Sequence, residues 1–318
     1  MKFTELFQAF AEGHIEKRTY WTLVRERCLP LLQFQQLLAE EPDCTSIEIR
    51  PEGVILTYRG IRMLFDFDQT FCRAEVILSI DRNPEQEDFD FIGRHLPQDA
   101  VVMDVGANVG IFSLSLWKDH PNIGKIYAFE PLPTTFAQMQ RNLALNAHAG
   151  KIAPVNAGVS NEKGSFDFFL PGADEAASMQ PNPDAFYQQE SVDGRYTGRA
   201  KMERHTCAVT TLDAFVQEHD VTRVDLVKCD VEGNERNVLL GGANVLKKYR
   251  PVVYCEMLRK HAKRFGYHPN DIIADMRGRG YRCYTFRNHE LTHFDRMDDE
   301  TVETNFFFLP EEKAEQLR

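Results

Sequence analysis

Apolar runs alternate with amphipathic stretches along the chain from about residue 99 onward. Short apolar runs bounded by turn residues predict buried strands, and apolar positions at helical spacing predict helices. The expected strands are AVVMDVG (100–106), KIYAFEP (125–131), KIAPVNAGV (151–159), VDLVKCDV (224–231), RPVVYCEM (250–257), YRCYTF (281–286) and TNFFFLP (304–310). The expected helices are IFSLSLWKD (111–119), TTFAQMQRNLALNA (134–147), NERNVLLGGANVLKK (234–248) and NDIIADMRGRG (270–280). Such alternation is typical of a largely parallel sheet with helices on both faces.

The last two expected strands are joined by the turn-rich link HELTHFDRMDDET (289–301), which has no room for a full crossover helix. A parallel connection normally contains such a helix, so we expect the final strand to be antiparallel. The pattern predicts an α/β fold with a mostly parallel seven-stranded sheet that ends in an antiparallel strand.

The N-terminal part of the chain has a different pattern. Residues 1–40 show helical periodicity, residues 46–80 contain short β-rich runs split by turn residues, and residues 85–96 read as a helix. We therefore expect a helical and β-hairpin cap over 1–96, followed by a second domain over 97–318. This cap could shape an acceptor site or form a homodimer contact. Within the second domain, the polar, Gly- and Pro-containing segment 171–206 reads as a variable lid.

Composition and charge exclude several classes of protein. Of the 318 residues, 43% are hydrophobic and 27% charged, which excludes wholesale disorder. The net charge of −11 disfavours a nucleic-acid partner. No run approaches the roughly 18 apolar residues of a membrane span, and early acidic residues do not fit a secretory signal. Seven scattered cysteines without a CxxC pair predict reduced core thiols in a cytoplasmic protein.

A glycine turn follows the first strand of the α/β part and opens its first helix. In this turn Gly106 allows a sharp bend and close ligand approach, and Gly110 allows tight packing of helix on strand. Asn108 replaces the middle glycine of the dinucleotide fingerprint, so NAD and FAD are disfavoured. We expect Asp104 to direct a carboxylate toward a cationic ligand. Glu130, at the end of the next strand, is placed to accept hydrogen bonds from both hydroxyls of a ribose.

A ligand with an adenosine, an amine and a positive sulfonium matches these features, and that ligand is S-adenosylmethionine. Asn156 and Ser160 flank the end of the third strand and are further candidate cofactor contacts near the adenine. The alternative is a simple glycine-rich turn with a solvated Glu130 and ordinary loop hydrogen bonds.

The chain resembles the FkbM-type class I methyltransferases from about residue 85 to residue 310. The matching pieces are VVMDVGANVGIFSL, IYAFEPLPTTFAQMQRNLALN, VNAGVSNEKG, TTLDAF, VDLVKCDVEGNERNVLLGG, RPVVYCEM and NFFFLP. The resemblance implies a Rossmann-like fold with strand order 3-2-1-4-5-7-6 and methyl transfer, commonly to a hydroxyl of a small molecule or sugar. Residues 1–80 lie outside these motifs, and 171–206 matches only loosely.

Acidic residues follow two neighbouring strands of the predicted sheet. Asp230 and Glu232 come after one strand, and Glu256 ends the next, so their carboxylates should meet at one edge beside the glycine turn. Asp230 is the first candidate for the group that orients or deprotonates an acceptor hydroxyl, and Glu256 the second. Alternatively, Asp230 and Glu232 cap the following helix. Three carboxylates could also hold Mg²⁺ or Ca²⁺, but we predict no metal site.

The sequence thus predicts a cytoplasmic S-adenosylmethionine-dependent methyltransferase acting on an oxygen of a small molecule or glycan. His205 could also act as a base, although a lone histidine is more often structural. One alternative is a binding or scaffolding protein that has lost catalysis. Another is a methyltransferase of RNA or protein, of which the RNA version is weakened by the negative charge.

Overall fold

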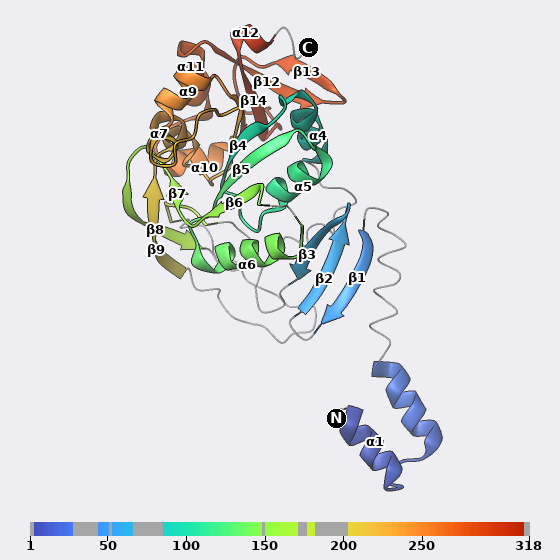
Figure 1. The fold of residues 1–318 in the computed structure, drawn as a ribbon. Coiled ribbons are helices and arrows are strands. Elements are labelled where there is room, and N and C mark those ends of the chain that lie inside the picture. Colours follow the sequence, from blue (N-terminus) through green and yellow to red (C-terminus); the bar gives the residue numbers. More distant parts are fainter. Residues whose placement is uncertain are drawn as a thin grey trace.

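A computed structural model describes residues 3–27, 44–50, 53–65, 85–147, 150–170, 177–181 and 203–314 (Figure 1). Its helices are α1 (Phe3–Ala11), α4 (Gln86–His95), α5 (Ile111–Asp119), α6 (Pro133–Ala144), α7 (Leu212–Glu218), α8 (Glu235–Gly241), α9 (Ala243–Tyr249), α10 (Arg259–Arg264), α11 (Pro269–Gly278) and α12 (Glu311–Ala314). Its strands are β1 (Cys44–Arg50), β2 (Gly53–Tyr58), β3 (Ile61–Phe65), β4 (Ala100–Val105), β5 (Ile123–Phe129), β6 (Ile152–Val155), β7 (Gly158–Val159), β8 (Gly164–Leu170), β9 (Glu203–Thr210), β10 (Leu226–Cys229), β11 (Val252–Glu256), β12 (Tyr281–Arg287), β13 (Glu290–His293) and β14 (Asn305–Pro310).

The large sheet has the order β13-β12-β14-β11-β10-β4-β5-β6. Without β13, this is the order 3-2-1-4-5-7-6 that the resemblance implies, read from the other edge. The pairs β4–β5, β5–β6, β4–β10 and β10–β11 are parallel, and β14 runs antiparallel to both of its neighbours. The antiparallel last strand is therefore confirmed.

The prediction of seven strands was wrong, because the sheet has eight strands in the part of the chain that the structure describes. The extra strand, β13, pairs with β12 through a two-residue turn at Asn288 and His289. Both turn residues have positive φ, of 50° and 63°, as a type I′ hairpin turn requires. The link between the last two predicted strands thus begins with a hairpin.

The sheet buries one hydrophobic cluster on each face. On one face α4, α5 and α6 contribute Phe89, Phe112 and Met139, which pack with Tyr254 and Phe307 of the sheet. The cluster on the opposite face contains residues of α7, α8, α9 and α11. Figure 1 shows α4 and α5 on the opposite side of the sheet from α7, α9 and α11. This arrangement leaves the carboxyl ends of the parallel strands as one edge on which a site can form.

A second sheet, β1-β2-β3, is antiparallel, and its edge strand β3 contacts α6 (Figure 1). Asn142 Oδ1 accepts the Leu64 amide at 2.9 Å, and Gln138 Nε2 donates to the Leu64 carbonyl at 2.8 Å. Asn146 makes the same pair of bonds with the backbone of Arg62, at 3.0 and 2.8 Å. The side-chain amides of Gln138, Asn142 and Asn146 follow one another at one turn of helix. They therefore provide hydrogen-bond partners for the backbone groups at the edge of β3, as a neighbouring strand would.

The N-terminal predictions are met where the structure describes them. The periodicity of residues 1–40 corresponds to α1 and the helical residues 17–27, and the β-rich pattern corresponds to β1, β2 and β3. The remainder of both predictions, over 28–43 and 66–84, lies outside the described residues. The division of the chain at residue 96 stays a prediction.

Three other elements differ from the sequence prediction. The helix expected over 234–248 is two helices, α8 and α9, which meet at Gly242. The third strand is divided into β6 in the large sheet and β7 in a three-stranded sheet, β7-β9-β8. Residues 203–206 of the expected lid belong to β9. Most of that lid, 171–176 and 182–202, lies outside the described residues.

Among the described residues, no helix has the length and apolar character needed to cross a membrane. The described cysteines, namely Cys44, Cys207, Cys229, Cys255 and Cys283, are all buried.

Candidate functional site

The glycine turn between β4 and α5 is folded against the loop that follows β10. Gly106 has φ +80°, and a Cβ there would lie 1.8 Å from the carbonyl oxygen of Asp230. Gly110 has φ +89°, and its Cβ would lie 3.1 Å from Met139 Cγ. Asn108 also has a left-handed backbone, with φ +51°. The turn therefore needs glycine at both predicted positions, for close contact with the neighbouring loop and with α6.

Glu130 joins the end of β5 to this turn. Its Oε2 accepts the Asn108 amide at 3.1 Å, and its Oε1 accepts the Leu132 amide at 2.9 Å. Burial raises the pKa of Glu130 to about 7, although these two hydrogen bonds and Lys228 oppose the shift. A carboxylate has about four acceptor positions, so two remain for a ligand.

Asp104 was predicted to direct its carboxylate toward the ligand, but it does not face an open site. Its side chain is wholly buried, Ser113 Oγ donates to Oδ2 at 2.6 Å, and Lys228 Nζ lies 3.6 Å from Oδ1. Burial raises the pKa of Asp104, and the Lys228 ammonium and the Ser113 hydroxyl oppose that shift. Lys228 Nζ also donates to the Gly106 carbonyl at 2.8 Å. Lys228 therefore holds the glycine turn through the Gly106 carbonyl, and Asp104 holds Lys228 in place.

Asn156 and Ser160 occupy different surroundings. Asn156 Nδ2 donates to the carbonyls of Glu130 and Pro131, at 2.9 and 3.1 Å, so it holds the chain that follows β5. Ser160 is buried after β7, and its carbonyl oxygen would lie 2.1 Å from a Cβ on Gly241 of α8. The structure thus places Asn156 beside Glu130 and Ser160 against α8.

The predicted catalytic carboxylates meet at the ends of β10 and β11. The Asp230 amide donates to the Val105 carbonyl at 3.1 Å, which places Asp230 beside the glycine turn. Lys228 Nζ lies 3.3 Å from Asp230 Oδ2. Burial raises the pKa of Glu256 well above its usual range, and the carboxylates of Asp230 and Glu232 add to that shift.

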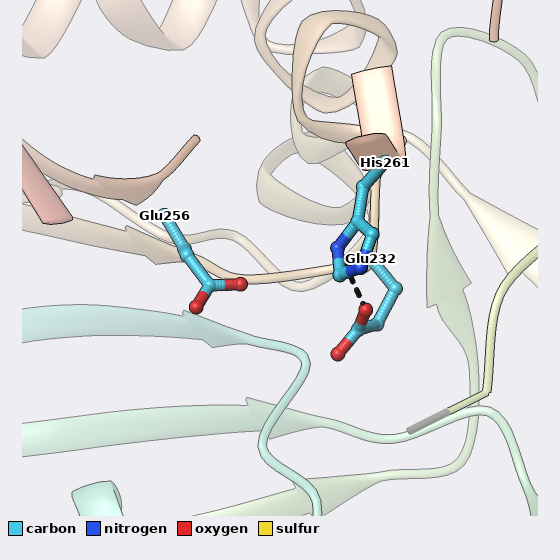
Figure 2. Close-up of side chains that lie close together, drawn as sticks. All are labelled: Glu232, Glu256 and His261. Atoms are coloured by element: carbon cyan, nitrogen blue, oxygen red, sulfur yellow. Dashed lines mark ion pairs between the residues drawn. The ribbon is translucent and has the colours of Figure 1, made fainter. Parts of the chain in front are cut away.

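Glu232 contacts a histidine that sequence reasoning did not find. His261 Nδ1, on α10, lies 2.9 Å from Glu232 Oε2, and Figure 2 shows both side chains near the carboxylate of Glu256. Asn234 is the N-cap residue of α8 and makes no side-chain capping hydrogen bond. Glu235, the first residue of the helix, instead fixes the preceding loop, because its Oε1 accepts the amides of Val231 and Gly233 at 3.2 and 2.9 Å. Glu232 itself has φ +55°. The alternative of a Glu232 cap is therefore replaced by an ion pair with His261.

Local contacts account for the weaker candidate His205 and for Asp213, which lies in the first turn of α7. His205 lies on β9, with Nε2 3.1 Å from Glu203 Oε2. Asp213 accepts the amides of Asn244 and Val245, at 3.0 and 2.9 Å, and so caps α9. Neither contact connects these residues to the glycine turn.

Comparisons with known proteins identify a family for this chain. Residues 104–283 match the methyltransferase FkbM domain, which is more than half of the chain. Methyltransferase sdnD of Sordaria araneosa is 30% identical over 46% of this chain and 62% of that protein. The 31-O-demethyl-FK506 methyltransferase FkbM of Streptomyces tacrolimicus is 32% identical over 44% of this chain and 58% of that protein. The hexuronic acid methyltransferase AglP of Haloferax volcanii is 27% identical over 54% and 62%.

The strand order and the glycine turn define a class I methyltransferase fold, with an acidic residue after the second of its parallel strands. The chain belongs to the FkbM methyltransferase family. It spans less than two thirds of the length of each of these three relatives.

Proposed function

We propose that the protein transfers a methyl group from S-adenosylmethionine to a hydroxyl of a small molecule or glycan. The observation that carries this proposal is the position of Glu130, whose carboxylate is held at the end of β5 by the Asn108 amide of the glycine turn. An acid at this place accepts hydrogen bonds from ribose hydroxyls in folds of this type.

The residues at the strand ends fit the cofactor. Gly106 and Gly110 have backbone conformations that bring the turn close to its neighbours and keep its amides near the start of α5. Glu130 has acceptor positions left for a ribose diol. Asn156 fixes the chain beside Glu130 and borders the expected adenine side. Asp104 acts through the turn that it supports, together with Lys228.

S-adenosylmethionine would supply an activated methyl group, so the protein's task is alignment and control of one proton. Methyl transfer is an in-line displacement, which depends on how closely the reacting atoms are positioned. Asp230 lies against the turn and is half-exposed, so its carboxylate can orient an acceptor hydroxyl or accept its proton. Lys228 bridges Asp104 and Asp230 and keeps both carboxylates in place.

The class of acceptor is proposed from the printed names of the relatives. One is named for a site on FK506 and another for hexuronic acid, so hydroxyl-bearing small molecules and sugars are the first substrates to test. We further propose that residues 1–96 shape the acceptor site. The support is the β3 edge on α6, since Asn142 of that helix also donates to the Val109 carbonyl in the glycine turn, at 2.9 Å.

The test is methyl transfer from labelled S-adenosylmethionine to a panel of sugars, hydroxylated metabolites and cell extract. Label in a small hydroxyl compound, lost when Asp230 is changed to Asn, is the expected result. Cofactor binding without transfer to any fraction would favour the scaffolding alternative. Retention on heparin with label in bulk RNA would favour an RNA methyltransferase instead. Light scattering on the same sample tests the proposed homodimer.

A further inference from the structure

Glu232, Glu256 and His261 come together from three separate segments. Glu256 is the last residue of β11, Glu232 lies in the loop after β10, and His261 lies on α10. Each offers one ligand atom, and these three atoms all lie within 4.8 Å of one another. Figure 2 shows the two carboxylates and the imidazole ring bordering one common space.

The local fold explains why α10 lies so close to the loop that carries Glu232. Gly233 has φ +108°, and a Cβ there would lie 2.7 Å from the His261 carbonyl oxygen and 2.8 Å from the Phe265 ring. Only glycine allows this approach. Gly233 therefore contacts α10 directly. The residue before it, Glu232, can then reach the imidazole of His261 on that helix.

The imidazole of His261 is buried without a hydrogen bond at Nδ1. The residue is 6% exposed, and Nδ1 is a buried nitrogen that lacks a hydrogen-bond partner, although Glu232 Oε2 is 2.9 Å away. The approach of the two atoms is thus close but not aligned for an N–H···O bond. A buried polar atom in this state is unusual in a folded protein.

The same separation suits two ligands of one metal ion. Ligand atoms at about 2.1 Å from an ion, at right angles, lie about 3 Å apart, and opposite ligands lie about 4.2 Å apart. The 2.9 Å between His261 Nδ1 and Glu232 Oε2 is close to the separation of two ligands at right angles. The three ligand atoms lie at most 4.8 Å apart, so a small side-chain rotation would bring them within the separation of opposite ligands, about 4.2 Å.

We propose that Glu232, Glu256 and His261 bind one divalent transition-metal ion, for which Mn²⁺ is the probe. Two carboxylate oxygens with one imidazole nitrogen favour such an ion over Ca²⁺ or Mg²⁺, which prefer oxygen ligands alone. Three protein ligands leave further positions open, as in catalytic metal sites.

The ion's role rests on the proposed methyl transfer, whereas its binding does not. The acceptor hydroxyl would occupy an open position and lose its proton more easily. Its oxygen forms a bond to the methyl carbon as the carbon–sulfur bond breaks, the sulfur keeps that electron pair, and the proton passes to Asp230 or water. Glu256 then serves as a ligand, and Asp230 remains the base.

The test is titration of the purified, EDTA-treated protein with Mn²⁺ alone, followed by electron paramagnetic resonance of free Mn²⁺. We expect one ion per chain, and electron spin-echo modulation from a histidine nitrogen. His261→Gln should remove the nitrogen modulation and weaken Mn²⁺ at least tenfold, and Glu256→Gln should weaken it similarly. His289→Gln is the matched control, because His289 is exposed, and its Mn²⁺ affinity should equal that of the wild type.

Absence of stoichiometric Mn²⁺, or unchanged affinity and modulation in His261→Gln, would overturn the proposal. So would a wild-type site that binds Mg²⁺ as tightly as Mn²⁺ and gives no nitrogen modulation. If His261→Gln does not fold, Glu232→Gln and Glu256→Gln decide the matter by the same tenfold criterion. S-adenosylmethionine affinity measured in EDTA tests the proposed function separately, since cofactor binding does not require the ion.

Discussion

The ammonium group of Lys228 lies 3.6 Å from Oδ1 of Asp104, and both side chains are removed from solvent. Burial lowers the pKa of a lysine, yet the carboxylates of Asp230 and Asp104 hold the pKa of Lys228 above its ordinary value. Lys228 therefore stays protonated inside the protein, next to the turn that the cofactor would contact.

Removing one partner of this pair should be strongly destabilising. Lys228→Met leaves the Asp104 carboxylate buried without its cation, which costs about 3–5 kcal/mol of unfolding free energy. Urea unfolding measures the loss. Lys260→Met, an exposed lysine on α10, is the control and should change stability by less than about 0.5 kcal/mol. The double variant Asp104→Asn/Lys228→Met should lose less than the sum of its single variants, and strict additivity would contradict the coupling.

The affinity for S-adenosylmethionine should depend on pH through Glu130. Burial raises the pKa of its carboxyl to about 7, so the ionised form that accepts ribose hydroxyls increases as pH rises through 7. From pH 6 to pH 8 the Kd should therefore fall, by up to about tenfold for one group with this pKa. In Glu130→Gln the Kd should be weaker and nearly independent of pH over the same range. A wild-type profile as flat as that of the variant would show that Glu130 does not control binding.

Asn142 should be a major determinant of stability because it ties α6 to two backbone segments. It is wholly buried, accepts the Leu64 amide and donates to the Val109 carbonyl. Asn142→Ala removes both of these hydrogen bonds to buried backbone groups, at about 1–3 kcal/mol each. Thermal and urea unfolding measure the loss, with the exposed Gln140→Ala on the same helix as a nearly neutral control. Equal stability of the two variants would mean that β3 does not depend on α6.

Asp230→Asn separates a chemical role from a structural one. Asparagine keeps the shape of the side chain and removes its basicity, so turnover should fall by about 10²–10⁴ if Asp230 accepts the acceptor's proton. S-adenosylmethionine affinity and melting temperature should change little. The control is Asp220→Asn, an exposed aspartate after α7, which should retain wild-type turnover. A fully active Asp230→Asn enzyme would rule out this role.

Much of the fold was predictable because apolar periodicity and glycine positions are local signals. The strands β4, β5, β10, β11, β12 and β14 coincide with continuous apolar runs, and helices α5, α6 and α11 with amphipathic ones. The hairpin that adds β13 was missed because its turn uses Asn288 and His289, and histidine gives little turn signal. The division of β6 from β7 depends on pairing with β9, a contact between distant residues.

The positions of the candidate site residues were predictable where a residue stands in the glycine turn or at the end of a strand. Asp230, Glu130 and Glu256 could be placed in this way. Lys228 could have been found from the sequence, because it is a charged residue inside the apolar run VDLVKCD. His261 left none, because its place beside Glu232 depends on the close approach of α10 to Gly233.

Isothermal titration of S-adenosylmethionine into wild-type protein and Glu130→Ala tests the central claim most directly. The account predicts one cofactor per chain for the wild type. The variant should bind more weakly by about 1.5–3 kcal/mol, the worth of hydrogen bonds to a charged group, with NAD giving no comparable heat. No binding by the wild type, an unchanged affinity in Glu130→Ala, or equal affinity for NAD would contradict the assignment of this turn as the cofactor site.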